Sequence, residues 1–142
     1  MSMEIANEVN TLVNSTMQEL LANASNKQGL LHTLNVLMVN RNTLEMESIV
    51  KRSYNIKNQN RINELIIEIK QAVTDEKVDG KAVFSNDNKR TIETEARAIV
   101  NEEVLYLRKQ IELDKSLVIK HDLIINNLRK LIEISVGLIK TL

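Results

Sequence analysis

The sequence contains no cysteine, no proline and no tryptophan, and its aromatic residues are limited to Tyr54, Phe84 and Tyr106. Without cysteine, the chain has no disulfide framework, no thiol nucleophile and no thiolate ligand for zinc. Without proline, and with three glycines in 142 residues, few positions interrupt a helix. We therefore expect an all-α protein held together by packed aliphatic side chains.

An excess of charge of one sign is also absent, since 19 Lys and Arg residues balance 19 Asp and Glu residues. Nucleic-acid binding usually depends on clustered cations that displace counterions from phosphates, so the balance argues against it as the main function. Small basic groups nevertheless keep one alternative open, an accessory protein of DNA recombination or replication. Its weak contacts to single-stranded DNA would involve Arg52, Arg61, Lys89, Arg90 and Tyr106.

The first 24 residues have neither a basic segment followed by an apolar run nor a long apolar stretch. Signal peptides need the first pattern and transmembrane helices need the second. We expect a cytoplasmic protein that does not contact a membrane.

Apolar residues recur every three or four positions from Ile5 to Ala24, which predicts a first helix. The spacing of Ser25 and Gln28 is that of a capping box, so a second helical stretch is expected to begin there and to continue to about Val73. Asparagines weaken its apolar pattern near residues 55–60, because asparagine side chains compete for backbone hydrogen bonds. Either one helix or two helices are compatible with this stretch, and the break is favoured.

A loop is predicted at residues 75–85, where Asp79-Gly80 is a strong turn signal and the flanking residues suit a short hairpin. Ser85 or Asn86 can cap the next helix, and residues 86–142 then contain no proline and a single glycine. The prediction is one all-α domain over residues 1–142: a helical bundle with an N-terminal helical hairpin in residues 1–74 and a long, coiled-coil-like C-terminal helix in residues 86–142.

Within the C-terminal stretch, residues such as Val100, Val104, Leu107 and Ile111 follow heptad spacing. Two positions of the same frame are polar, Asp114 and His121. One interpretation is a register-setting pair that meets between chains of an oligomer. The favoured interpretation places both residues at a solvated rim.

The apolar stripe widens beyond residue 117 to about half of the helix circumference, which is typical of a bundle or oligomer core. We therefore predict a homo-oligomer. The residues predicted to form its interface are Leu117, Ile124, Ile125, Leu128, Leu131, Ile132 and Leu138.

Signatures of catalysis are missing from the chain. It has no Glu-x-x-His motif for a carboxylate-bridged metal pair, no glycine-rich phosphate loop and no serine nucleophile elbow. Its acidic residues alternate with Lys and Arg at helical spacing, as in Glu93 and Arg97, which favours a self-paired solvated face. The prediction is a protein that is not an enzyme and uses no metal or cofactor.

The segment from Gly80 to Arg90, followed by Glu93-x-Glu95-x-Arg97 and Glu103-x-Leu105-Tyr106, resembles a pattern in small coiled-coil proteins of phage and prophage early regions. The resemblance covers residues 79–135. It implies a loop-to-helix entry that leads into a charged coiled coil, and a host or phage protein as partner. The predicted function is therefore a homo-oligomeric helical interaction protein; beside the DNA-binding alternative stands a third, an anti-defence sponge that binds a small ligand.

Overall fold

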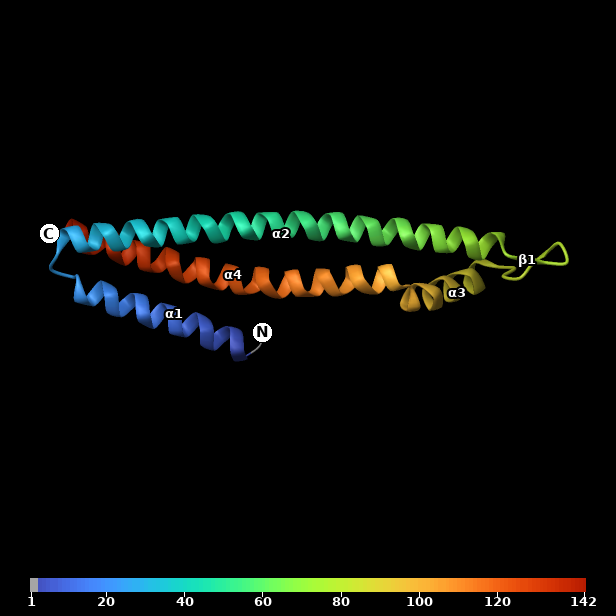
Figure 1. Cartoon of the computed structure of the whole chain (residues 1–142), viewed down its shortest axis with the longest axis horizontal. Coiled ribbons are helices and arrows are strands. Elements are labelled where there is room, and N and C mark those ends of the chain that lie inside the picture. The colour runs from blue at the N-terminus through green and yellow to red at the C-terminus, as the bar shows by residue number, and fades with distance from the viewer. Residues whose placement is uncertain (1–2) are drawn as a thin grey trace. The chain divides into compact units, whose positions relative to one another are not determined.

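The computed structural model describes residues 3–142, apart from the side chains of residues 3–6 and 9. It consists of α1 (Met3–Ala22), α2 (Lys27–Asp75), β1 (Lys77–Val78), β2 (Lys81–Ala82), α3 (Asp87–Val100) and α4 (Glu102–Lys140), as Figure 1 shows. The all-α prediction is confirmed. The chain forms two compact units: unit 1 comprises residues up to Arg52 together with Ser116–Leu142, and unit 2 comprises Ser53–Lys115.

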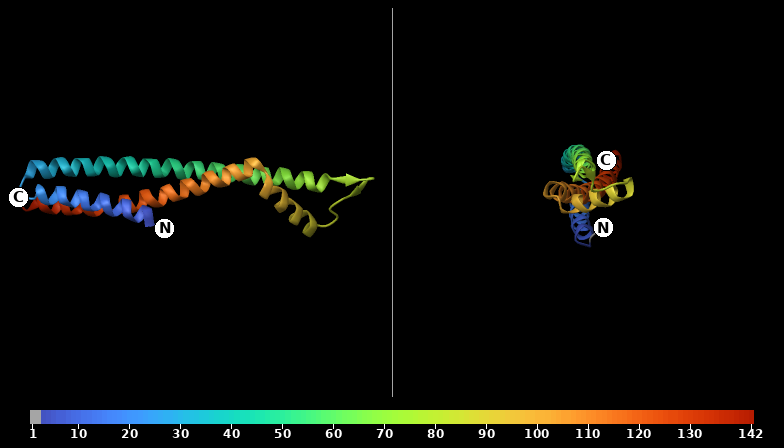
Figure 2. Two further views of the ribbon diagram at one scale, coloured as in Figure 1. Left: turned by 60° about the horizontal axis from the view of Figure 1, so that its bottom comes forward. Right: turned by 90° about the vertical axis from the view of Figure 1, so that its right-hand side faces the viewer.

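Unit 1 is a bundle of α1, the first part of α2 and the last part of α4, which lie side by side (Figures 1 and 2). Its core consists of leucines that are at most 3% exposed. These are Leu20 from α1, Leu30 and Leu37 from α2, and Leu128 and Leu131 from α4. Ile5 and Val9 of the predicted α1 stripe have side chains outside the described part of the chain.

The junction between α1 and α2 differs in detail from the predicted capping box. The residue that caps α2 is Asn26, whose Oδ1 accepts the Gly29 N–H at 3.2 Å. A Cβ atom at Gly29 would lie 2.4 Å from Asn23 Oδ1, so a larger residue would require the Asn23 side chain to move. The predicted capping box, with Ser25 before the helix and Gln28 as its third residue, is wrong. Helix α2 begins at Lys27, so its third residue is Gly29.

Helix α2 is continuous from Lys27 to Asp75, so the break favoured near residues 55–60 is absent. The polar residues there do not divert the backbone. Ser53 and Asn60 are exposed, and Gln59 Nε2 donates to Asn63 Oδ1 at 3.1 Å rather than to a main-chain carbonyl. Asparagine lowers helix propensity by a few tenths of a kcal/mol, roughly 0.5, which tertiary packing on the opposite face offsets.

Unit 2 confirms the first part of the predicted heptad seam. Val104 and Ile111 of α4 are 0% and 6% exposed, and they pack against Ile62 and Leu65 of α2. The hairpin prediction is also confirmed, because β1 pairs with β2 in antiparallel register around the turn at Asp79-Gly80. Both turn residues have positive φ, 52° and 76°, which explains the need for glycine at the second position.

The predicted single helix over residues 86–142 is divided into α3 and α4 at Asn101 (Figure 2). Asn101 has extended backbone angles (φ −71°, ψ 121°), and its Oδ1 accepts the Val104 N–H at 3.0 Å. An unbroken helix would continue the seam from Val104 through Val100 to Arg97 and Glu93, and would bury two charges. With the break, α3 instead buries two small side chains, those of Thr94 and Ala98.

Helix α3 is capped by Asn86, one of the two predicted capping residues. Its Oδ1 accepts the Lys89 N–H at 2.9 Å. Within α3 the buried residues are Thr94 and Ala98, and Arg97 makes ion pairs with Glu93 and Glu76.

Candidate interaction surfaces

The seven residues predicted to form an oligomer interface lie on α4 in unit 1, and most of them are used inside the chain. Ile125, Leu128 and Leu131 are 5% exposed or less. Ile124, Ile132 and Leu138 are partly buried and pack against the same leucine core. Leu117 alone among the seven is more than a third exposed, at 39%. This face is therefore the core of unit 1, and its predicted role between chains stays a prediction.

The predicted register pair, Asp114 and His121, divides between the two units. Asp114 is half-buried. His121 is 12% exposed, and its Nε2 lies 3.7 Å from Glu47 Oε2 on α2, so a carboxylate of the same chain faces the imidazole. The side chain of His121 is largely covered while that of Glu47 is exposed, and both interpretations of the pair stay predictions. The sequence analysis did not identify Glu47, because the alignment of α2 against α4 cannot be predicted from the sequence of either helix alone.

Near His121, unit 1 has a polar groove of about 460 Å³ between α2 and α4. Arg52 Nη2 contacts Asp122 at 2.7 Å and Arg129 Nη2 contacts Glu45 at 2.9 Å. The groove also contains Ser48, which is 1% exposed and whose hydroxyl has no hydrogen-bond partner among the described residues. Since each arginine already faces a carboxylate, the groove offers little attraction to an anion.

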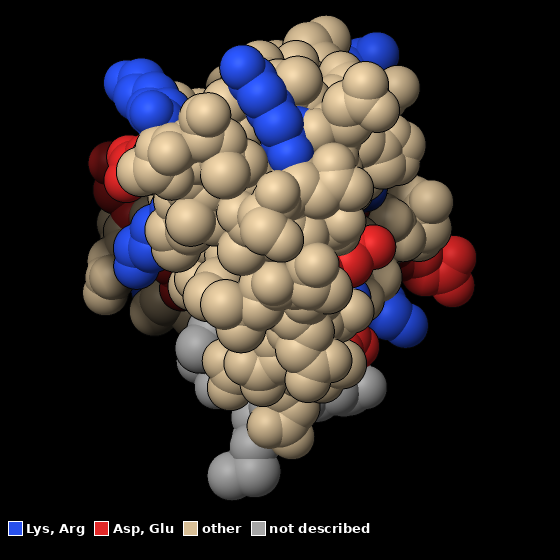
Figure 3. All heavy atoms as spheres, turned by 90° about the vertical axis from the view of Figure 1, so that its left-hand side faces the viewer, with Lys and Arg blue, Asp and Glu red and all other residues tan. Residues whose placement is uncertain are grey.

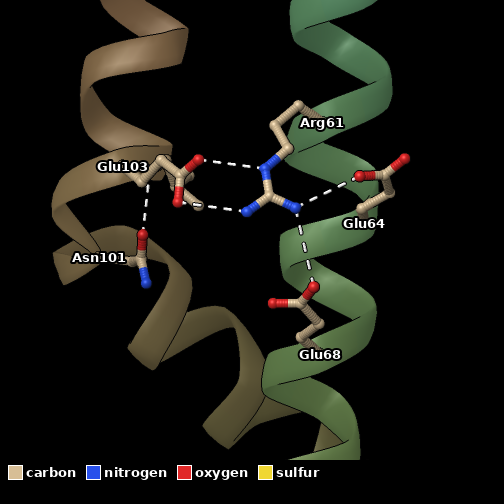
Figure 4. A network of polar contacts seen from close by, with 6 residues as sticks. Arg61, Glu64, Glu68, Asn101 and Glu103 are labelled. Carbon is tan, nitrogen blue, oxygen red and sulfur yellow. Dashed lines mark hydrogen bonds and ion pairs between the residues drawn. The ribbon is translucent and has the colours of Figure 1, made fainter.

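In unit 2, Arg61 is surrounded by acids (Figure 4). Its guanidinium donates to Glu103 at 3.1 Å and to Glu64 at 3.3 Å, and Glu68 lies 3.7 Å away. The hydrogen bond to Glu103 raises the pKa of Arg61 most, followed by the bond to Glu64. A phosphate at this position would compete with three carboxylates, which disfavours the predicted contact to single-stranded DNA.

The other predicted nucleic-acid contacts of unit 2 are Lys89, Arg90 and Tyr106. Arg90 Nε donates to the Phe84 carbonyl at 3.1 Å, which closes the loop before α3. Lys89 is exposed beside it. Tyr106 is 61% exposed on α4. The aromatic ring of Phe84 is covered by Arg97, whose guanidinium carbon lies 5.7 Å from the ring centroid.

Helix α3 exposes its largest apolar side chains. Ile92, Ile99 and Val100 are 60%, 60% and 71% exposed, while Thr94 and Ala98 are buried. At 100° per residue, Ile92, Ala96, Ile99 and Val100 share one face of α3, opposite the buried residues. This arrangement reverses the usual burial of an amphipathic helix. We call these four residues the α3 row.

A second exposed apolar surface lies along α2 within unit 1. Leu31, Met38, Met46 and Ile49 are between 40% and 61% exposed. Two exposed asparagines alternate with them, and the buried Leu30 and Leu37 lie on another face of the helix. We call this set the α2 row; its members are Leu31, Asn35, Met38, Asn42, Met46 and Ile49.

An open groove of about 500 Å³ lies between α1 and α2 in unit 1, with α4 beneath it. Leu12, Val36 and Leu128 contribute apolar surface, and Ser15 and Thr43 contribute hydroxyls. The end of unit 1, at the α1–α2 junction, is mostly uncharged, with charged side chains mainly around its edge (Figure 3). Unit 1 therefore has exposed apolar side chains along α2 and a mostly uncharged end.

Within residues 3–142, no group of three or more His, Asp or Glu side chains is arranged to hold a metal ion. None of the described helices is long and apolar enough to cross a membrane. Comparisons with protein-family models, with curated proteins and with solved structures found no match. The surfaces themselves are therefore the basis for a functional proposal.

Proposed function

We propose that this protein is a non-catalytic helical interaction protein that works as an assembly of several copies of itself. The observation that carries the proposal is the α3 row, in which Ile92, Ile99 and Val100 face outward. A helix that buries threonine and alanine and exposes isoleucine and valine has the pattern of an element whose main packing partner is another chain.

The energetic argument is one of magnitude. Complete burial of an isoleucine or valine contributes roughly 1.5–3 kcal/mol, so covering these three half-exposed side chains contributes about 3–5 kcal/mol per copy. Association costs on the order of 4–15 kcal/mol in lost freedom of motion. The α3 row therefore supports weak association alone and stable association when a second surface contributes.

The electrostatic balance supports the same proposal. The chain carries 19 cationic and 19 anionic side chains, so two copies approach each other without net repulsion. Many of the charged groups already pair within the chain, for example Arg61 with Glu103 and Arg97 with Glu93.

The test is the mass of the full chain in solution, measured by light scattering over a wide concentration range. We expect a mass above the 16.2 kDa of one chain, rising with concentration. The double variant Ile92→Gln/Ile99→Gln should lower the mass or shift the transition to higher concentration, with unchanged helicity by circular dichroism. Its control is Thr91→Gln, at an exposed position of α3 outside the row.

A constant mass of 16.2 kDa at every concentration would refute self-association. Equal masses for the row variant and its control would refute the role of α3. The resemblance to phage proteins adds a separate prediction, a host or phage protein as further partner, and the same two variants serve there as test and control in capture from a lysate.

A further inference from the structure

The β1–β2 hairpin of unit 2 has no packed face. It extends past the end of α2 (Figures 1 and 2), and every residue from 75 to 83 is exposed. Its strands have two residues each, and the two pairs between them are Lys77 with Ala82 and Val78 with Lys81. A two-stranded hairpin without a third strand or a covering helix is marginally stable in water. The turn at its tip therefore opens readily.

The two residues of this turn can react with each other. Gly80 follows Asp79 and is the only glycine in the sequence that comes after an aspartate or an asparagine. The Cγ atom of an aspartate can be attacked by the amide nitrogen of the next residue, because the ring that forms has five members. A side chain on that next residue hinders the attack, and glycine has none. Space around Gly80 is also open, since a Cβ atom built there would have no heavy atom within 4 Å.

Within residues 3–142, neither reacting group is held by another contact. The Gly80 N–H donates no main-chain hydrogen bond, and the exposed Asp79 carboxylate has no hydrogen bond or ion pair. Asp79 has φ 52°, in the left-handed region that is strained for a residue with a side chain. Opening of the turn relieves this strain. It also allows the torsion angle about the Asp79 Cα–C bond that ring closure needs and that the closed turn does not have.

We propose that Asp79 is a site of spontaneous isoaspartate formation, which proceeds through opening of the β1–β2 hairpin. The Gly80 nitrogen attacks Cγ of the protonated Asp79 carboxyl group, so that an N–Cγ bond forms and the Cγ–OH bond breaks. The hydroxyl group and the amide proton leave together as water. A water molecule then adds to the main-chain carbonyl carbon of the imide, and the bond from this carbon to the Gly80 nitrogen breaks. The chain then continues through Cγ, with no net change in atoms.

The product has one additional carbon atom in the main chain between residues 79 and 80. A two-residue turn of this type accepts two ordinary residues with positive φ, so the longer linkage no longer matches the register of Val78 with Lys81. Conversion therefore opens the hairpin permanently. The packing of α2 against α4 is unaffected, because its core residues lie outside the hairpin. This modification is separate from self-association and goes beyond the proposed function.

The site is tested by incubating the full-length chain at physiological temperature over several days. Trypsin cleaves after Lys77 and Lys81, and chromatography separates the aspartate and isoaspartate forms of the peptide 78–81, which have equal mass. The other four aspartates lie in helices, precede larger residues and serve as internal controls. We expect Asp79 to convert at least tenfold faster than any of them, and equal rates would overturn the proposal. The control residues are Asp75, Asp87, Asp114 and Asp122.

The role of opening is tested with Lys77→Cys/Ala82→Cys, which places the two thiols of an otherwise cysteine-free chain at directly opposed positions. The disulfide should keep the hairpin closed and slow conversion of Asp79 at least fivefold, whereas the reduced form of the same variant should convert at the wild-type rate. Equal rates in the two forms would overturn the requirement for opening. The mass in solution is measured on the same samples, so failure of self-association is distinguished from failure of this proposal.

Discussion

Truncation of Leu128 distinguishes a core residue from an interface residue. Leu128 is 2% exposed and packs within unit 1 against leucines of α1 and α2. Replacing a fully buried leucine with alanine removes its transfer free energy and leaves a cavity, which together cost about 2–5 kcal/mol. For a chain of this length, each kcal/mol lowers the melting temperature by roughly 2–4 °C, so Leu128→Ala should melt about 6–12 °C lower if the cost is about 3 kcal/mol.

The assay is thermal unfolding followed by circular dichroism, at a concentration where the wild-type mass is that of one chain. The matched control is Leu31→Ala, because Leu31 is 46% exposed and its truncation leaves no enclosed cavity. That variant should lose less than about 1 kcal/mol. If Leu128→Ala kept the wild-type melting temperature while the mass of the assembly fell, Leu128 would be an interface residue, and the packing argument for unit 1 would fail.

Two further predictions concern the backbone of unit 2. Loss of the cap in Asn101→Ala should lower the free energy of unfolding by about 1 kcal/mol in urea titrations, whereas Asn88→Ala, at an exposed position inside α3, should change it by less than half as much. Gly80→Ala puts a side chain at φ 76° and should cost roughly 1–2 kcal/mol locally, seen as faster hydrogen exchange of the Val83 N–H, which donates to the Glu76 carbonyl. Its control, Gly137→Ala in α4, has open space for the Cβ and should stabilise the chain by about 0.5–1 kcal/mol; equal effects of the two glycine variants would contradict the assigned turn geometry.

Local patterns in the sequence were sufficient for much of the fold. The heptad spacing of Val104 and Ile111 depends only on helical periodicity, and both residues are core residues of unit 2. Asp79-Gly80 predicts its turn because the backbone there needs positive φ at two successive positions. Each of these features is decided within a few residues, so the sequence alone reveals it.

Features that depend on distant residues were less accessible. The wide apolar face around Leu128 has the same pattern whether α1 and α2 cover it or another chain does, and the sequence could not decide between these outcomes. The contact between Glu47 and His121 depends on the alignment of two helices more than 70 residues apart in the chain. The break at Asn101 had a local signal, an asparagine followed by Glu102 and Glu103, which is typical of a helix start.

The spacing of the α3 row can be found in the sequence, but its exposure cannot. Ile92, Ile99 and Val100 share a helix face in the sequence, but nothing local says that this face points outward. Its exposure follows from the packing of Thr94 and Ala98 on the other side, which is a tertiary property.

The bend at Asn101 links a charged pair and an apolar surface that would otherwise be unrelated. Because the helix stops there, Arg97 and Glu93 stay at the surface with Glu76, and Val100 leaves the seam in which Val104, four residues later, is fully buried. A variant that straightened this joint would have to dehydrate the ion pair in order to cover the valine. Straightening the helix at Asn101 would therefore change two properties together, the hydration of the ion pair and the exposure of Val100.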